Sequence, residues 1–330
     1  MQNGSIDFVL LWVDGNDPEW QKLFFKYQAE TGDKRPLRFR DMGILRYWFR
    51  GVEAYAPWVN KVYFVTCGQI PDWLNTANPK LVCVNHDQFI PEQYLPTFSS
   101  HTIELNLHRI PGLSEQFVYF NDDMFLVGET RQTQFFIRGL PCDEAIMEYH
   151  MPERYPLFMS PIANAALLNF HFQKREVLRR YFGKFFSPRY RATDLLKNIK
   201  HSTGRYIPGF RSPHLYSNFL KSTFEEVWAA EPELLDGVCR HRFRDLTDVN
   251  QWVLQDWQRC TGRFYPRRYP GTPFFIRSVE DVRDAFKFVT DSKAKIICLN
   301  DEVLEDFEQV KTELQRAFHG LLSQKSSYER

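Results

Sequence analysis

Short apolar runs alternate with helical patterns through the first 127 residues of the chain. Four runs have the length and the β-branched and aromatic composition of buried strands, and they cover residues 6–13, 61–67, 81–84 and 117–120. Between them lie two patterns with apolar residues at helical spacing, residues 42–55 and 101–109. This alternation is typical of a mostly parallel, Rossmann-like sheet with helices on both faces. We therefore expect an α/β fold.

Three predicted strands end in acidic residues. The acidic ends are Asp14 with Asp17 after residues 6–13, Asp122 with Asp123 after residues 117–120, and Asn300 with Asp301 after residues 295–299. In an open α/β sheet, ligands bind in the crevice at the carboxyl ends of the strands. If the three strands are parallel neighbours, their oxygen ligands meet in that crevice and suit Mg²⁺ or Mn²⁺ together with substrate phosphates. The alternative for each pair is a plain turn, in which Asp and Asn are common.

The length of 330 residues fits one large catalytic domain, 1–330. Within it we expect an α/β part (1–128), a mainly helical insertion (129–290), and a final core strand with a closing helix (291–330). Helices are predicted over residues 163–181, 224–235, 247–260 and 301–322, and a polar tail over 323–330. Residues 190–221 are rich in Arg, Lys, His, Ser, Pro and Gly, and we interpret them as a long functional loop.

Composition and charge narrow the classes of function. The 42 basic and 41 acidic side chains nearly cancel, so no net field attracts nucleic acid. The six cysteines form no C-x-x-C pair, and we interpret them as reduced residues of a cytoplasmic protein rather than a disulfide frame or a zinc site. No apolar stretch approaches the ~18 residues of a membrane span. We expect a protein that associates with a membrane at most peripherally.

Basic side chains that could contact phosphate cluster in the second half of the chain. His214 lies in SPHLYSN with Arg211 just before it, and Arg244 lies in RHRFRDLTD. Such donors can stabilise the charge of a transferred phosphoryl group. The ordinary interpretation of the basic run is a solvated face, and that of a lone loop histidine is a structural role. Contact with the acidic crevice would favour catalysis instead.

The chain resembles the Stealth family in a series of sequence blocks. In chain order the blocks are IDFVLLWVDGNDPEW, RFRDMGILRYWFRGVEAYAPWVNKVYFVTCGQIPDWLN, LPTFSSHTIELNLHRIPGLSEQFVYFNDDMFLVGE, HLYSNF with FRDLTDVNQ, and KIICLNDE. The family comprises bacterial capsular and cell-wall polysaccharide phosphotransferases, with the animal lysosomal-enzyme N-acetylglucosamine-1-phosphotransferase as a relative. The resemblance is most specific in the first two-fifths of the chain.

The resemblance implies a fold similar to GT-A glycosyltransferases, with nucleotide binding in 1–128 and contacts to acceptor and phosphate in 129–290. It implies transfer of an intact hexose or N-acetylhexosamine 1-phosphate from a UDP-sugar to an acceptor sugar, which is an oligosaccharide or a lipid-linked glycan. UMP would leave and a phosphodiester would form, in capsular or cell-wall polysaccharide synthesis at the inner face of the membrane. One alternative is a metal-dependent GT-A-like glycosyltransferase that releases UDP, and another is a binding protein without catalysis.

The matching positions carry expected roles. Metal ligands would be Asp122, Asp123, Asn300 and Asp301, and catalytic residues would be His214, Arg244, Asp123 and Asp301. The general base stays open between His214 and a carboxylate beside the metal, whose pKa neighbouring acids would raise.

Cofactor-binding and nucleotide-binding roles are expected for Asp14, Gly15, Arg40 and Asp41. Asp14 would bind the metal or hydrogen-bond the uridine or ribose. Gly15 would allow a tight turn or a close approach of the backbone to a ligand. Arg40 and Asp41 would contact phosphate or pair with each other.

Overall fold

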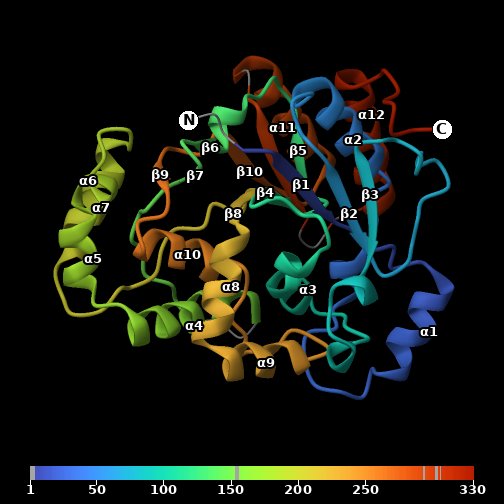
Figure 1. Cartoon of the computed structure of the whole chain (residues 1–330). Helices are drawn as coiled ribbons and strands as arrows, with labels where there is room; N and C mark the ends of the chain where they lie inside the picture. The colour runs from blue at the N-terminus through green and yellow to red at the C-terminus, as the bar shows by residue number, and fades with distance from the viewer. Residues whose placement is uncertain (1–3, 153–155, 293, 302–303, 305) are drawn as a thin grey trace.

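The main sheet of the protein has five strands. The computed structural model describes residues 4–152, 156–292, 294–301, 304 and 306–330. The strand order is β3 (Leu81–Asn85), β2 (Val62–Thr66), β1 (Ile6–Leu11), β4 (Gln116–Phe120) and β8 (Ser217–Leu220). The first four strands are parallel, and β8 runs antiparallel to β4. The prediction of a mostly parallel α/β sheet is therefore confirmed (Figure 1).

A second sheet carries the last predicted strand. Its order is β10 (Gly271–Ile276), β11 (Ile296–Asp301) and β5 (Met124–Leu126), and β11 runs antiparallel to β5. The condition that the three acid-ended strands are parallel neighbours therefore holds for β1 and β4 and fails for β11. Their ends still meet, because β5 follows β4 after a short turn and the Leu299 N–H donates to the Asp123 carbonyl at 2.8 Å. A small third sheet joins β6 (Phe136–Ile137), β7 (Leu140–Asp143) and β9 (Tyr265–Pro266).

Helices cover both faces of the main sheet. Successive side chains of a strand point to opposite faces, and Phe8 of β1 packs in one core with Trp48 of α2 (Leu45–Tyr55). Its neighbour Val9 packs in a second core with Leu105 of α3 (Ser100–Asn106). Figure 1 shows α2, α11 (Val279–Ser292) and α12 (Phe307–Leu321) on one side and α3 on the other.

The insertion is more finely divided than its sequence predicts. The helix α1 (Pro18–Lys26) follows β1 and lies outside the insertion. Within the insertion the chain forms α4 (Pro156–His171), α5 (Lys174–Arg180), α6 (Phe182–Phe185), α7 (Ala192–Ser202), α8 (Lys221–Ala230), α9 (Pro232–Arg240) and α10 (Trp252–Cys260). The helix predicted over 224–235 is two helices, because Pro232 takes the first position of α9, where its missing N–H costs nothing. The helix predicted over 163–181 is likewise split between α4 and α5.

The long loop predicted over residues 190–221 is wrong in part, because α7 and β8 lie within it. The helix α7 is anchored by a polar side chain rather than by an apolar face. Asn198 donates to the carbonyls of Ala145 and Phe185 and accepts from the Met147 N–H at 2.7–2.8 Å. The apolar residues that α7 carries at helical spacing, Leu196 and Ile199, are exposed, so the apolar pattern does not mark the packed face.

The residues predicted as a polar tail, 323–330, are part of the packed structure. Glu329 forms a two-pronged ion pair with Arg50 of α2 at 2.7 and 2.8 Å. Tyr328 is 2% exposed and lies against Phe49. The segment therefore closes over the outer side of α2.

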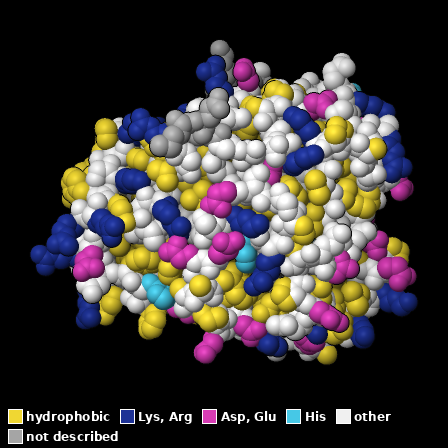
Figure 2. All heavy atoms as spheres, viewed as in Figure 1, with side chains coloured by type: hydrophobic (Ala, Val, Ile, Leu, Met, Phe, Trp, Pro, Cys, Tyr) yellow, Lys and Arg dark blue, Asp and Glu magenta, His cyan; other side chains and the backbone are white. Residues whose placement is uncertain are grey.

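The surface mixes charges of both signs. On the face seen in Figure 2, basic and acidic side chains are interspersed with apolar ones. Among the described residues, no helix combines the length and the apolar character needed to cross a membrane. All six cysteines are free thiols.

Candidate active site

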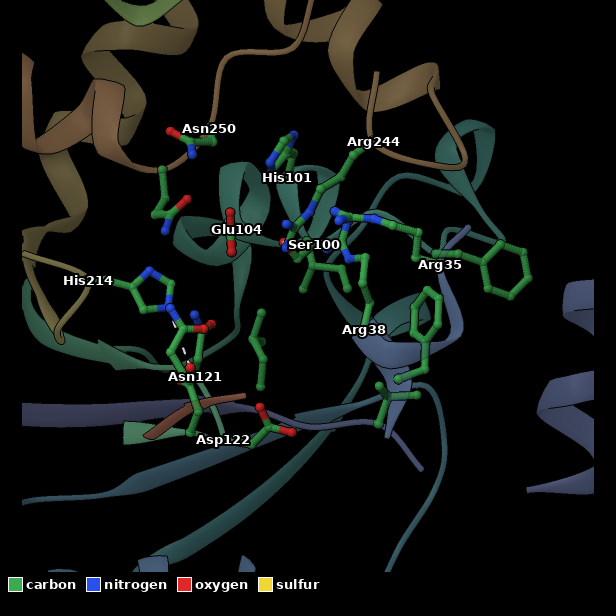
Figure 3. Close-up of a pocket in the computed structure, with 18 of the residues that line it drawn as sticks. Arg35, Arg38, Ser100, His101, Glu104, Asn121, Asp122, His214, Arg244 and Asn250 are labelled. Carbon is green, nitrogen blue, oxygen red and sulfur yellow. Dashed lines mark hydrogen bonds and ion pairs between the residues drawn. The ribbon is translucent and has the colours of Figure 1, made fainter. Parts of the chain in front are cut away.

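A cleft of about 1010 Å³ opens at the carboxyl ends of β1, β4 and β11. The short helix η1 (Pro36–Phe39), the start of α3, and the chain around His214, Arg244 and Asn250 complete its walls. Figure 3 shows acidic and amide side chains on one wall and arginines on the opposite wall. The cleft lies where the crevice rule for α/β sheets places a ligand.

Three carboxylates form the acidic wall: Asp122, Asp123 and Asp301. Burial raises the pKa of Asp122 well above its ordinary value, and the charges of Asp123, Asp41 and Asp301 add to this effect. Burial also raises the pKa of Asp301, and the charge of Asp123 raises it further, whereas Arg40 acts to lower it.

This acidic wall fits a hard divalent cation. Like charges held together out of water are stabilised by a bound cation. One carboxylate oxygen of Asp123, Oδ1, is buried and has no hydrogen-bond partner within the described part of the chain. Asn300 lines the cleft beside Asp301 and offers an amide oxygen.

Arg40 and Asp41 have different partners. The Arg40 Nη2 atom lies 2.5 Å from the Asp301 Oδ2 atom, so this arginine supports the acidic wall through an ion pair. Asp41 accepts a hydrogen bond from the Gly43 N–H at 2.9 Å. Burial raises the pKa of Asp41, and the charge of Asp14 adds to the effect although the Gly43 N–H opposes it. Asp41 borders a smaller hollow behind the acidic wall, together with Asp122 and Asp301.

His214 stands at the end of the acidic wall. Its Nε2 atom lies 3.4 Å from Asp123 Oδ2, and the Cys298 thiol donates to the same oxygen at 3.3 Å. Burial acts to lower the pKa of His214, but the hydrogen bond and charge of Asp123 outweigh it, so the pKa is raised. The backbone of His214 is left-handed, with φ of 47°. Such a conformation in a residue other than glycine is uncommon, and strain of this kind is concentrated at functional sites.

Three arginines form the opposite wall: Arg35, Arg38 and Arg244. Arg244 donates to Ser100 Oγ at 2.5 Å, and Asp33 holds both Arg35 and Arg38, at 2.7 and 3.2 Å. Burial lowers the pKa of Arg38, and the charge of Arg244 lowers it further. Positive charges kept together in this way form a binding site for an anion.

Sequence reasoning missed Arg35 and Arg38, although a signal was present. Arg38 lies on the 3₁₀ helix η1, and Arg35 is the N-cap residue three positions before it. A spacing of three is the repeat of such a helix.

Of the basic run around Arg244, only Arg244 lines the cleft. Arg240 pairs with Asp236, and Arg242 pairs with Glu30. His241 binds the buried Asp248 at 2.6 Å. The interpretation as a solvated face therefore holds for Arg240, whereas His241 and Arg242 are half-buried and Arg244 lines the cleft.

Two further polar side chains of the cleft went unnoticed in the sequence. Asp248 also binds Nδ1 of His101 at 3.0 Å, and His101 lines the cleft. Glu104 is fully buried beside it and accepts a hydrogen bond from the Tyr119 hydroxyl at 2.9 Å. Burial raises the pKa of Glu104, against the opposing charge of Arg244.

The first acidic strand end lies beside the cleft rather than in its lining. Asp14 accepts a hydrogen bond from the Asn16 N–H, and Asp17 caps the first turn of α1 at the Trp20 N–H. The Gly15 N–H donates to the Phe39 carbonyl, and a Cβ atom at Gly15 would lie 2.2 Å from that oxygen. The glycine therefore lets η1 approach the end of β1.

Family models match two regions of the chain. Stealth protein CR1, conserved region 1, matches residues 4–23, and Stealth protein CR2, conserved region 2, matches residues 38–141. These regions supply β1, η1 in part, and the turn that carries Asp122 and Asp123.

Curated relatives match nearly the whole chain. The capsular polysaccharide phosphotransferase WcwK of Streptococcus pneumoniae is 38% identical over 99% of this chain and 98% of its own. The receptor polysaccharide phosphotransferase WefC of Streptococcus oralis is 39% identical over 98% of this chain and 99% of its own. The exopolysaccharide phosphotransferase cps2G of Lactiplantibacillus plantarum is 39% identical over 99% and 96%.

Solved structures match at low similarity. The galactosyltransferase LgtC, in complex with donor and acceptor sugar analogues, has a TM-score of 0.41 at 9% identity, over 97% of this chain and 98% of its own. The bifunctional glycosyltransferase WbbM has a TM-score of 0.43 at 9% identity, over 98% of this chain and 53% of its own.

Proposed function

Because this chain belongs to the Stealth protein family, we propose that it transfers an intact sugar 1-phosphate to an acceptor sugar in bacterial polysaccharide synthesis. The donor is a UDP-sugar carrying a hexose or an N-acetylhexosamine. The products are a phosphodiester-linked glycan and UMP. The printed names of relatives that align over almost their full length support a phosphotransferase of capsular or exopolysaccharide synthesis.

The observation that carries the proposal is the pairing of opposite walls in one cleft. Arg35, Arg38 and Arg244 face Asn121 and Asp122 across it (Figure 3). A diphosphate needs donors for its oxygens and a cation for its charge, and the two walls offer both. His214 lies at the acidic wall, where the β-phosphate would be held.

The reaction is a displacement at phosphorus. The acceptor hydroxyl oxygen bonds to the β-phosphorus, and its proton passes to Nδ1 of His214, because Nε2 is the ring nitrogen that faces Asp123 Oδ2. The bond between the β-phosphorus and the bridging oxygen breaks, and UMP leaves with that oxygen. The bond between the sugar carbon and its phosphate oxygen stays intact. We assign the base to His214 because Asp123 stabilises the imidazolium that forms.

The arginine wall and the acidic wall both stabilise the negative charge of the diphosphate. Arg38 and Arg244 donate to the phosphate oxygens, and such donors strengthen as charge develops in the transition state. Asp122 and Asp123, with Asn300 and Asp301, would hold Mg²⁺ or Mn²⁺, which neutralises the diphosphate when bound. Asp14 and Gly15, at the end of β1 beside the cleft, would bind the nucleoside.

The acceptor is an oligosaccharide or a lipid-linked glycan, and the reaction takes place in the cytoplasm at the inner face of the membrane. The free thiols of all six cysteines support a reducing compartment.

The identity of the released nucleotide tests the proposal. The enzyme is incubated with Mn²⁺, a panel of UDP-sugars and candidate acceptor glycans, and the nucleotides are separated by chromatography. We expect UMP, together with a phosphodiester signal of the product in ³¹P NMR. UDP with a product lacking phosphorus would show a glycosyltransferase, and binding without turnover across the panel would show a binding protein.

A further inference from the structure

One buried polar atom of the cleft is not used by the proposed reaction. Gln251 is 6% exposed and lines the cleft, and its Oε1 atom has no hydrogen-bond partner among the residues the structure describes. A buried amide oxygen without a partner has lost its hydrogen bonds to water and destabilises the folded state. A ligand hydroxyl that donates to this oxygen would remove this destabilisation.

The chain around Gln251 is held rigidly. Asn250 and Asn164 of α4 exchange two hydrogen bonds, at 2.9 and 3.2 Å, and the Trp252 N–H donates to Asn250 at 3.2 Å. The start of α10 is therefore fixed on α4 before any ligand arrives. Preorganisation of this kind reduces the entropy that binding must overcome.

This segment lies on the His214 side of the cleft. The Trp252 ring centre is 6.3 Å from that of His214, with the planes at 77°. Tyr149 lines the same cleft and is 65% exposed. Its strand-like segment pairs with the chain that leads to His214, through the Arg211 N–H to Ile146 and the Glu148 N–H to Gly209.

We propose that Gln251, Trp252 and Tyr149 form the subsite for the acceptor sugar, which is a pyranose ring presented with one hydroxyl toward His214. The proposal rests on the proposed function and adds the place and chemistry of the acceptor. Gln251 accepts a hydrogen bond from a ring hydroxyl. The aromatic faces pack against the C–H face of the ring, because aromatic side chains offer a large apolar surface with a polar tip.

In the proposed function, Arg35, Arg38 and Arg244 bind the donor rather than the acceptor. The arginines lie on the wall opposite the acidic side chains (Figure 3), where the proposed function places the donor's phosphates, so substitutions in the acceptor subsite and in the arginine wall should act on different substrates. This separation makes the inference testable by kinetics with two substrates.

The test compares Michaelis constants for donor and acceptor. Initial rates of UMP release are measured with the UDP-sugar that the wild type turns over. The acceptor is varied among methyl glycosides of glucose, galactose and N-acetylglucosamine. The variants are Gln251→Met, Trp252→Ala, Trp252→Phe and Tyr149→Ala. Tyr206→Ala is the matched control, because Tyr206 is 60% exposed but does not line the cleft.

We expect the KM for the methyl glycoside to rise at least tenfold in Gln251→Met and Trp252→Ala, with the KM for the UDP-sugar within twofold of wild type. Trp252→Phe keeps an aromatic face, should fold even if Trp252→Ala does not, and should lose less than Trp252→Ala. Acceptor KM within twofold of wild type in Gln251→Met and Trp252→Phe, or an equal rise in both KM values, would overturn the subsite. Failure of the proposed function is distinct, because the wild type would then release no UMP.

Discussion

At the scale of single residues, Asp123 links the parts of the site. Its carbonyl fixes the end of β11 through the Leu299 N–H, and one carboxylate oxygen meets both His214 and the Cys298 thiol. The other carboxylate oxygen is buried without a hydrogen-bond partner among the described residues, and we propose that it binds the cation. His214 is held in a left-handed backbone that points its ring at this carboxylate.

Replacement of His214 tests its role as the base. We expect His214→Asn to reduce the rate of UMP release by ~10²–10⁴-fold, the range that general base catalysis supplies. Asparagine is chosen because it tolerates the left-handed backbone of this position better than alanine does. The melting temperature should change by only a few degrees. His319→Asn, on the exposed side of α12, is the control. Wild-type turnover in His214→Asn would remove His214 from the mechanism.

Family resemblance predicted the residues of the acidic wall, His214 and Arg244. The strand-end pattern alone did not decide between a ligand site and a plain turn for each acidic pair. For Asp17 the turn is correct, because this residue caps α1. Arg35 and Arg38 were not found, since their role depends on the fold that brings η1 over β1. Gln251 ends the block FRDLTDVNQ, but the sequence does not show that its side chain is buried in the cleft.

At the scale of elements, one buried carboxylate, Asp33, holds the two arginines at the start of η1 and within it. Asp33 binds Arg35 and Arg38, and although burial acts to raise its pKa, the hydrogen bond to Arg35 and the charges of both arginines lower it to about 2. A carboxyl with a depressed pKa in the folded state stabilises the fold above its unfolded pKa of ~3.9, and this stabilisation is lost as the pH falls through the folded value.

We expect Asp33→Asn to lower the free energy of unfolding by ~1–3 kcal/mol at pH 7 and to raise the KM for the UDP-sugar. The difference in stability between variant and wild type should shrink between pH 4 and pH 2. Urea unfolding at several pH values measures it. A difference that stays constant down to pH 2 would show that the charge of Asp33 contributes nothing.

The C-terminal segment stabilises α2 through a buried ion pair. Removal of one partner leaves the other charge buried, at a cost of ~3–5 kcal/mol. We therefore expect Glu329→Gln to lower the free energy of unfolding by ~3 kcal/mol, while the folded variant still turns over. Glu225→Gln is exposed on α8 and should change stability by less than ~0.5 kcal/mol. Equal stability of the two variants would contradict the role of the Arg50–Glu329 pair.

The elements that the sequence predicts well are those with strong periodicity. The four parallel strands of the main sheet are continuous apolar runs, and each lies within a residue or two of its expected place, whereas β8 was not predicted as a strand. Segments anchored by polar contacts, such as α7 and residues 323–330, were misjudged because burial there depends on partners far along the chain.

At the scale of the whole molecule, two sheets meet to build one wall. Periodicity identifies β11 as a strand but does not say which sheet it joins. Because β5 turns back from β4 and pairs with β11, acids separated by nearly 180 residues come to one cleft edge. Opposite them, η1 and the chain before Asp248 bring the arginines. The site therefore needs the complete chain from β1 to β11.

A crystal structure with Mn²⁺ and an unreactive UDP-sugar, in which CH₂ replaces the oxygen between the two phosphorus atoms, tests the central claim most directly. We expect manganese bonded to Asp123, and the β-phosphate between His214 on one side and Arg38 and Arg244 on the other. The anomalous signal of manganese locates the ion independently of the ligand. A diphosphate bound away from Asp123 and His214, or an acidic wall that takes no manganese, would contradict the proposed site.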